Sequence, residues 1–405
     1  VYINFGKSIG VINDESYNPH LFNVPSDKSI DLFSANRYTV YTWLSDGKSY
    51  AYKIRSCRGF FLDSVPQMNG IFSLYAGSQD ILWIGTDGKG IFYAYPDNSF
   101  FKTIKTNAPV RAICERDNGD ILVGTKGEGI KVLDKETGNV IHSYTESNGL
   151  ISNVVYAIKK NINGDIFIGT EGAGLNILRN GTNKIEFLPL STTSYKSIYC
   201  ITFTSHDSYA WLGSSSSGIL RLKLSAKNGT YTIDNEKAYN TSSNKEDLRS
   251  NTVYSIIKGR QDDELWIGAR YGGVYKILTE SDKIYPLEKL MQSSLNMDED
   301  VLSLSLSANN DLWVGTSYGL NKIILGQDSA YITEYTDKEG LTNNTIHGIL
   351  EDRNHNIWIS TNHGISCIDH NTNKITNYTS RDGLQNDEFA DCAYYKGSDG
   401  ILYFG

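Results

Sequence analysis

A short string built around tryptophan returns along the whole chain and constrains the fold more than any other feature. It reads LWIGT from Leu82, LWIGA from Leu265, LWVGT from Leu312 and IWIST from Ile357. All six tryptophans occupy the same position of this string. Aligned on that position, the string recurs at Trp43, Trp83, Leu122, Phe167, Trp211, Trp266, Trp313, Trp358 and Tyr403, with a weaker copy at Tyr2.

A small residue lies two positions after each aligned residue and defines the period. These small residues are Ser45, Gly85, Gly124, Gly169, Gly213, Gly268, Gly315, Ser360 and Gly405, with Asn4 in the weak copy. From Ser45 onward the steps are 40, 39, 45, 44, 55, 47, 45 and 45 residues. A period in the forties with several short strands per unit predicts an all-β fold of the β-propeller type.

Each unit contains four apolar or alternating runs. A strand and a polar turn, such as DNGD at 117–120, come before the aligned strand, and the Asn-Gly step supplies the positive φ of a tight hairpin. A glycine turn, a third strand such as IKVLD at 130 and a more polar fourth strand such as NVIHSYT at 139 follow it. We therefore expect four-stranded antiparallel blades. The aromatic ring should pack on the next blade, and the small residue should let the next backbone come close.

The number of copies exceeds what one ring normally holds. Ten copies of the string are present, counting the weak copy at Tyr2, whereas propellers typically have about four to eight blades. The last seven copies, whose small residues run from Gly124 to Gly405, predict a seven-bladed propeller over residues 106–405. Residues 1–105 would then be the terminal blades of a preceding propeller. An eight-bladed ring with two additional copies is the alternative.

Charge and composition exclude several classes of protein. The formal net charge is −8 and no run of basic residues occurs, which argues against nucleic acid or an anionic membrane surface as a partner. No apolar stretch is long enough to span a membrane. The histidines His347, His355 and His363 and the widely spaced cysteines lack metal-ligand spacing, and no cofactor motif is present. The first residue is not Met, so we expect a piece of a longer chain.

One unit in particular resembles a known repeat. The segment GLTNNTIHGILEDRNHNIWISTNHGISCID, from Gly340 to Asp369, is similar to the two-component-regulator propeller repeat. Its lead-in recurs as LISNVV at 150 and LRSNTV at 248. The resemblance implies the periplasmic sensor region of a hybrid two-component system histidine kinase. It further implies two seven-bladed propellers, a β-sandwich, one membrane span and cytoplasmic kinase, receiver and DNA-binding parts, with an oligosaccharide as ligand and glycan-utilisation genes as the output.

The innermost strand of each blade offers candidate ligand-binding residues. Propellers bind ligands at the axial funnel or a rim, because loops from every blade meet there. The equivalent positions hold Arg111, Tyr156, Tyr199, Tyr254, Leu302, His347 and Ala390. Aromatic faces stack on sugars, and Arg and His bind hydroxyls, uronates or sulfates. We therefore predict Arg111, Tyr156, Tyr199, Tyr254 and His347 as the ligand-binding set, with packing between blades as the alternative role.

Three functions fit this pattern. The first is a non-catalytic sensor that binds an oligosaccharide, acts as a homodimer and meets the membrane only through a segment outside this chain. The second is a propeller enzyme of the polysaccharide-lyase type with His347 or Tyr254 as acid or base, since the fold alone does not decide activity. The third is a protein-interaction scaffold. The sequence favours the sensor, with no catalytic residues, no metal and no cofactor in this region.

Overall fold

The computed structural model divides the chain into two compact units, Val1–Lys102 and Thr103–Gly405. The predicted boundary, after residue 105, lies close to this division. The fold is described for residues 2–4, 8–13, 16–23, 29–35, 39–44, 49–53, 58–61, 71–76, 82–87, 90–94, 101–135, 137–172, 174–191, 194–204, 207–227, 230–242, 248–288, 300–326 and 330–405. Ser45, one of the small residues that define the period of the repeat, lies outside the described residues.

The N-terminal unit consists of antiparallel sheets in chain order. The first contains β1 (Tyr2–Asn4), β2 (Ser8–Asn13) and β3 (Ser16–Asn23). The second contains β4 (Ile30–Ala35), β5 (Thr39–Leu44), β6 (Ser49–Lys53) and β7 (Arg58–Phe61). The third contains β8 (Ile71–Ala76), β9 (Leu82–Thr86) and β10 (Ile91–Ala94). Trp43 lies in one buried cluster with Leu82 and Ile84 of the third sheet, so the second and third sheets share a core.

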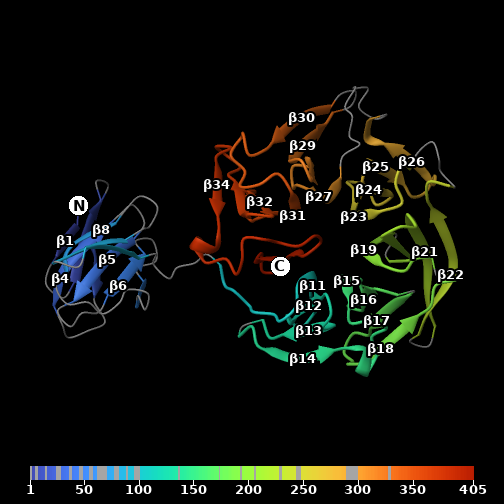
Figure 1. The fold of residues 1–405 in the computed structure, drawn as a ribbon, viewed down its shortest axis with the longest axis horizontal. Helices are drawn as coiled ribbons and strands as arrows, with labels where there is room; N and C mark the ends of the chain where they lie inside the picture. The colour runs from blue at the N-terminus through green and yellow to red at the C-terminus, as the bar shows by residue number, and fades with distance from the viewer. Residues whose placement is uncertain are drawn as a thin grey trace. The chain divides into compact units, whose positions relative to one another are not determined.

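The C-terminal unit is a propeller of six four-stranded antiparallel sheets, in which the first strand of each lies nearest the centre (Figure 1). Blade 1 has β11 (Val110–Glu115), β12 (Ile121–Thr125), β13 (Ile130–Leu133) and β14 (Val140–Tyr144); blade 2 has β15 (Val155–Lys160), β16 (Ile166–Thr170), β17 (Leu175–Leu178) and β18 (Ile185–Leu188); blade 3 has β19 (Ile198–Thr204), β20 (Tyr209–Ser214), β21 (Ile219–Lys227) and β22 (Thr230–Tyr239).

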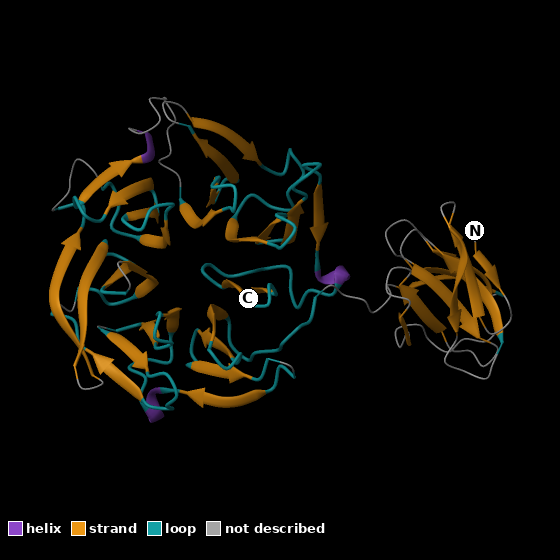
Figure 2. Ribbon diagram, turned by 180° about the vertical axis from the view of Figure 1, so that it is seen from behind, coloured by secondary structure: helices purple, strands orange, loops and turns teal. Residues whose placement is uncertain are grey.

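The remaining blades follow the same order. Blade 4 has β23 (Val253–Lys258), β24 (Glu264–Ala269), β25 (Gly273–Leu278) and β26 (Lys283–Pro286); blade 5 has β27 (Val301–Leu306), β28 (Leu312–Thr316), β29 (Leu320–Leu325) and β30 (Ala330–Tyr335); blade 6 has β31 (Ile346–Glu351), β32 (Ile357–Thr361), β33 (Gly364–Ile368) and β34 (Ile375–Tyr378). Short helical turns at Glu146–Asn148 and Ser380–Asp382 and a helical stretch at 287–288 lie among the strands and loops of the described residues (Figure 2).

A two-stranded sheet closes the ring between blade 6 and blade 1. It pairs β35 (Tyr394–Lys396) with β36 (Leu402–Phe404), and β35 packs against both β31 and β11. A methyl group on Gly405 would lie 2.6 Å from Val110 Cγ1 of blade 1, so the two backbones meet closely. The prediction of four-stranded blades is confirmed. The predicted count of seven is not, because the described residues form six such blades and this shorter sheet.

Glu115 holds this closing sheet to blade 1. The residue is 3% exposed, and its carboxylate accepts hydrogen bonds from the Ser398 backbone N–H (2.6 Å) and hydroxyl (2.9 Å). The Lys135 ammonium donates to the same carboxylate at 2.7 Å and also contacts Asp399. Burial disfavours the charged form, but these partners outweigh it and lower the pKa of Glu115. The ring is therefore fastened by a charge-assisted cluster as well as by strand packing.

The repeated aromatic and small residues have the packing role expected from the sequence. Trp211 and Trp266 are almost fully buried, each in a core shared with the next blade. A methyl group on Gly124 would lie 2.7 Å from Val155 Cγ1 of blade 2, which explains why the position is small. Trp358 is only half-buried, because the sheet that follows blade 6 has two strands instead of four.

The turns that lead into the blades are fastened by asparagine side chains. Asn153 Oδ1 accepts from the backbone N–H of Glu146 at 2.9 Å, and Asn344 Oδ1 accepts from that of Asp337 at 2.7 Å. Each bond spans seven residues, so the amide ties the end of one blade to the start of the next. Within the described part of the chain, no helix has the length and apolar character needed to cross a membrane.

Candidate functional site

A β-bulge at the same place in every first strand creates the candidate site. The register with the second strand shifts between Val110 and Ala112 in blade 1, and equivalent shifts occur in the other five four-stranded blades. A bulge leaves one residue outside the ladder and turns its side chain in a new direction. The residues left out are Arg111, Tyr156, Tyr199, Tyr254, Leu302 and His347.

Three of these residues form a continuous aromatic array across neighbouring blades. The rings of Tyr156 and Tyr199 meet edge to face with centroids 5.0 Å apart. Tyr199 and Tyr254 stack with centroids 5.3 Å apart and planes 9° apart. All three side chains are half-buried, and burial raises the pKa of each phenol, that of Tyr254 to about 12. At neutral pH they are therefore uncharged rings that carry hydroxyl groups.

His347 is held in a defined orientation beside this array. Its residue is 8% exposed, and Nδ1 lies 2.5 Å from Asp391 Oδ1 while Nε2 lies 2.7 Å from Asn362 Oδ1. Burial lowers the pKa of His347, but the hydrogen bond and charge of Asp391 outweigh it, so the pKa is raised. With an acceptor oxygen at each ring nitrogen, the arrangement suits an imidazolium that donates both protons. Asp391 correspondingly has a lowered pKa.

Two arginines complete the electrostatics of the site. Arg270 Nε lies 3.2 Å from Asp300 Oδ1, an ion pair without hydrogen-bond alignment, and its guanidinium lies 5.0 Å from the Tyr271 ring centroid. Arg111 is half-buried and close enough to influence Tyr156, Tyr199 and His347 electrostatically. Among the described residues, no carboxylate lies within ion-pair distance of Arg111.

The structure thus brings all five predicted ligand-binding residues to one end of the propeller. Leu302, the equivalent position in blade 5, is buried and apolar. Ala390 lies in the turn before β35, and its backbone N–H donates to Gly405 O at 2.9 Å. The next residue, Asp391, is the one that reaches the site.

Several residues of this end were missed by sequence reasoning. Asp391 and Asn362 are separated from His347 by 44 and 15 residues, so only the tertiary fold reveals their contacts. Tyr271 and Tyr318, 62% and 63% exposed, lie on the loops after the second strands of blades 4 and 5. These loops share the end of the propeller that carries the bulges, since each first strand begins beside the end of its second strand. The recurring aromatic-glycine pairs YGG and YGL were an available signal.

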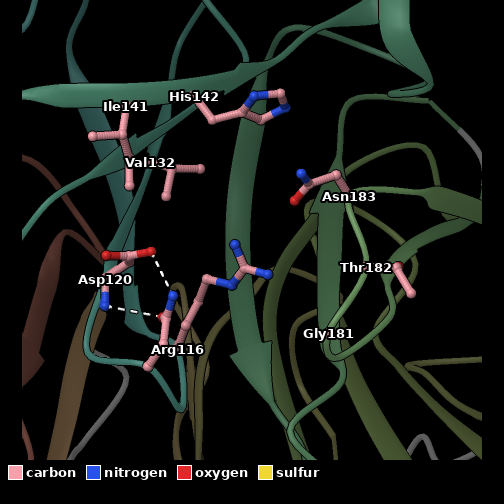
Figure 3. A pocket seen from close by; sticks show the side chains of 9 residues that line it. Arg116, Asp120, Val132, Ile141, His142, Gly181, Thr182 and Asn183 are labelled. Carbon is pink, nitrogen blue, oxygen red and sulfur yellow. Dashed lines mark hydrogen bonds between the residues drawn. The ribbon is translucent and has the colours of Figure 1, made fainter.

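A cavity of about 440 Å³ (Figure 3) lies at the opposite end of the blades from the bulges, away from the predicted residues. Its walls come from the turn between β11 and β12, from β13 and β14, and from the turn between β17 and β18. The axial tyrosines and this cavity are therefore separate features of the propeller.

Comparison with known proteins supports the repeat and the fold. The two-component regulator propeller model matches residues 340–363, a single repeat in blade 6. Histidine kinase P4 of Formosa agariphila is 27% identical over 212 residues, which is 52% of this chain and 15% of that protein.

Two solved structures share the fold over the full length of the chain. The extracellular domain of the putative hybrid two component system BT3049 from B. thetaiotaomicron has a TM-score of 0.64 at 22% identity. That of BT4673 has a TM-score of 0.58 at 16% identity. The chain spans 53% and 55% of these two solved chains. The resemblance drawn from the sequence is therefore confirmed: residues 340–363 match the two-component regulator propeller repeat, and the chain shares its fold with those two extracellular domains.

Proposed function

We propose that this chain is part of the periplasmic sensor of a hybrid two-component system histidine kinase, and that it binds an oligosaccharide at the bulge end of the propeller. The convergence of Tyr156, Tyr199 and Tyr254 from three blades is the observation that carries this proposal. A row of neutral aromatic faces suits the apolar faces of sugar rings, and their hydroxyl groups suit sugar hydroxyls. The repeat match and the extracellular-domain relatives support the sensor role.

The charges of the site favour a ligand with an acidic group. His347 is paired with Asp391 and Arg270 with Asp300, which leaves Arg111 as the cation without a matching carboxylate among the described residues. A guanidinium presents a planar fork that binds a carboxylate or sulfate with two hydrogen bonds. Uronate-bearing or sulfated oligosaccharides therefore belong in the panel of candidate ligands.

The lyase alternative fits this geometry less well. A general base needs a free acceptor within hydrogen-bond reach of the substrate proton. His347 directs one ring nitrogen at Asp391 and the other at Asn362, and the pKa of Tyr254 is raised to about 12. Neither group is poised as a base near neutral pH, so we favour binding without turnover.

Calorimetric titration against defined oligosaccharides, with analysis of the sugars afterwards, tests the proposal. We expect saturable binding with the sugar recovered intact, and loss of binding in Arg111→Ala while Arg116→Ala, at the other end of the propeller, binds normally. Cleaved or unsaturated sugar would establish the lyase. No binding by neutral or acidic sugars would overturn the oligosaccharide proposal and favour the scaffold.

In the full-length protein we propose that the chain acts as a homodimer, because a signal crossing the membrane through one span per subunit requires a change between subunits. We also propose that residues 1–105 are the terminal blades of a preceding propeller. Phe72, Tyr75 and Trp83 of the third sheet are 70%, 67% and 42% exposed, whereas the equivalent Trp43 is 6% exposed. A further blade of that propeller would cover this face, and β35–β36 would be the inner half of the seventh blade of the following one.

A further inference from the structure

The cavity at the opposite end of blade 1 has no part in the proposed function. Arg116, Asn118 and Asp120 line it from the turn between β11 and β12, and Val132 supplies apolar surface (Figure 3). Asn118 Nδ2 donates to Asp120 Oδ2 at 2.7 Å, which orients that carboxylate. Its volume of about 440 Å³ falls within the range of small-molecule sites, ~300–1,000 Å³.

The same position in blade 2 is already occupied by a tyrosine. The turn 161–165 of blade 2 corresponds to 116–120 of blade 1, because Lys160–Ile166 and Glu115–Ile121 are equivalent strand pairs. Tyr231 of blade 3 enters there and is 8% exposed.

The phenol of Tyr231 is fully hydrogen-bonded in that position. It donates to Asp165 Oδ2 at 2.8 Å and accepts from Asn161 Nδ2 at 2.8 Å. Its ring meets Phe167 edge to face at 5.1 Å and lies 4.6 Å from the Arg179 guanidinium. An aromatic ring with a hydroxyl tip thus occupies the end of blade 2.

Hairpin length explains why one position is filled and the other open. Strands β21 and β22 are 9 and 10 residues long and carry Tyr231 across to blade 2. Strands β17 and β18 have only 4 residues each, and the turn between them places Thr182 and Asn183 on the wall of the cavity. Blade 1 therefore keeps the polar turn of the site but receives no ring from its neighbour.

We propose that this cavity binds the side chain of a tyrosine presented by a loop of a partner protein. Asp120 would accept the hydrogen bond of the phenol, as Asp165 does for Tyr231, and Arg116 would donate to it in the place of Asn161. Val132 corresponds to Ile177 and provides the apolar wall. The filled site in blade 2 is the reason for assigning a protein loop as the source of the ring.

Ligand-observed NMR with N-acetyl-tyrosinamide as the probe tests this assignment on the whole chain. We expect saturable binding at millimolar concentration and about tenfold weaker binding of N-acetyl-phenylalaninamide, which lacks the hydroxyl. Thr182→Trp, which places a bulky ring at the cavity wall, should abolish binding of the probe. Arg116→Ala should weaken binding and reduce the preference for the tyrosine amide, because the donor to the phenol is lost. Arg111→Ala should bind the probe like the unmodified protein.

Several results would overturn the proposal: equal binding of the two amides, unchanged binding by Thr182→Trp and Arg116→Ala, or no saturation at all. Melting temperatures close to that of the unmodified protein establish that each variant is folded. Because neither probe is a sugar and Arg111→Ala is the control, failure here leaves the oligosaccharide proposal unaffected.

Discussion

Tyr199 and Tyr254 stack with their ring planes 9° apart, although each belongs to a different blade. Both rings are placed by bulges, which turn them out of their own ladders toward one another. The aromatic array is therefore a product of the repeat: one local irregularity, copied in each blade, assembles a surface that no single blade contains.

The first prediction concerns this stack. Tyr254→Ala should weaken binding of the oligosaccharide found by titration by roughly 30-fold, about 2 kcal/mol, as expected for a central aromatic contact. Tyr254→Phe should retain most of the affinity, because the stacking ring remains. Calorimetry measures both, and equal affinity of Tyr254→Ala and the unmodified protein would contradict a role for the array in binding.

The second prediction concerns the buried tryptophans. Trp266→Ala should lower the free energy of unfolding of the propeller by about 3–5 kcal/mol, since the ring is 1% exposed and fills the contact with blade 5. Trp358→Ala should lower the free energy of unfolding by less, because that ring is only half-buried. Denaturant unfolding compares the two, and an equal or larger loss for Trp358→Ala would refute the packing argument.

The third prediction concerns ring closure. Glu115→Ala should destabilise the propeller by about 3 kcal/mol, because it removes a buried carboxylate that holds Ser398 and Lys135. Glu128→Ala is the matched control, since Glu128 only pairs with Lys131 at the surface and should cost less than about 1 kcal/mol. Urea unfolding measures both losses.

The pH dependence of this cluster follows from the lowered pKa of Glu115. A lowered folded-state pKa contributes stability that is present above the ordinary value of 4.5 and is lost as the pH falls through the folded value. The difference between Glu115→Ala and the unmodified protein should therefore shrink below about pH 4.5. A constant difference down to pH 2 would contradict the assignment of a charged Glu115.

The fourth prediction concerns His347 and Asp391. The raised pKa of His347 contributes stability fully present below its ordinary value of 6.5, which is lost as the pH rises through the folded value. The lowered pKa of Asp391 contributes stability above its ordinary value of 3.8. The pair should therefore contribute most to the stability of the folded protein between about pH 4 and 6.5.

Asp391→Asn isolates this pair. It should lower the pKa of His347, as followed by NMR titration of the imidazole, and reduce stability at pH 6 more than at pH 8.5. Asn362→Asp, which puts a carboxylate at the other ring nitrogen, should raise that pKa further. An unchanged pKa in both variants would show that these neighbours do not determine the protonation of His347.

The fold was largely predictable because its determinants are periodic. Trp211, Trp266 and Gly124 contact the next blade through short-range patterns that repeat every forty-odd residues, so spacing alone indicates the sheets and their packing faces. The candidate positions on the innermost strands were predictable for the same reason, whereas the bulges at these positions were found only in the structure. The number of complete blades was not, because the copy at Tyr403 belongs to a two-stranded sheet.

What the sequence by itself determined is the repeated unit: four strands, an aromatic residue for the next blade, and one candidate ligand-binding position on the innermost strand. Only the tertiary structure decided which of these residues meet. It pairs His347 with Asp391 across the ring closure, and it lets Tyr231 fill the end of blade 2 while blade 1 stays open. The physical reason is that such contacts depend on hairpin length and on closure of a ring, which join residues distant in the chain and leave no periodic mark.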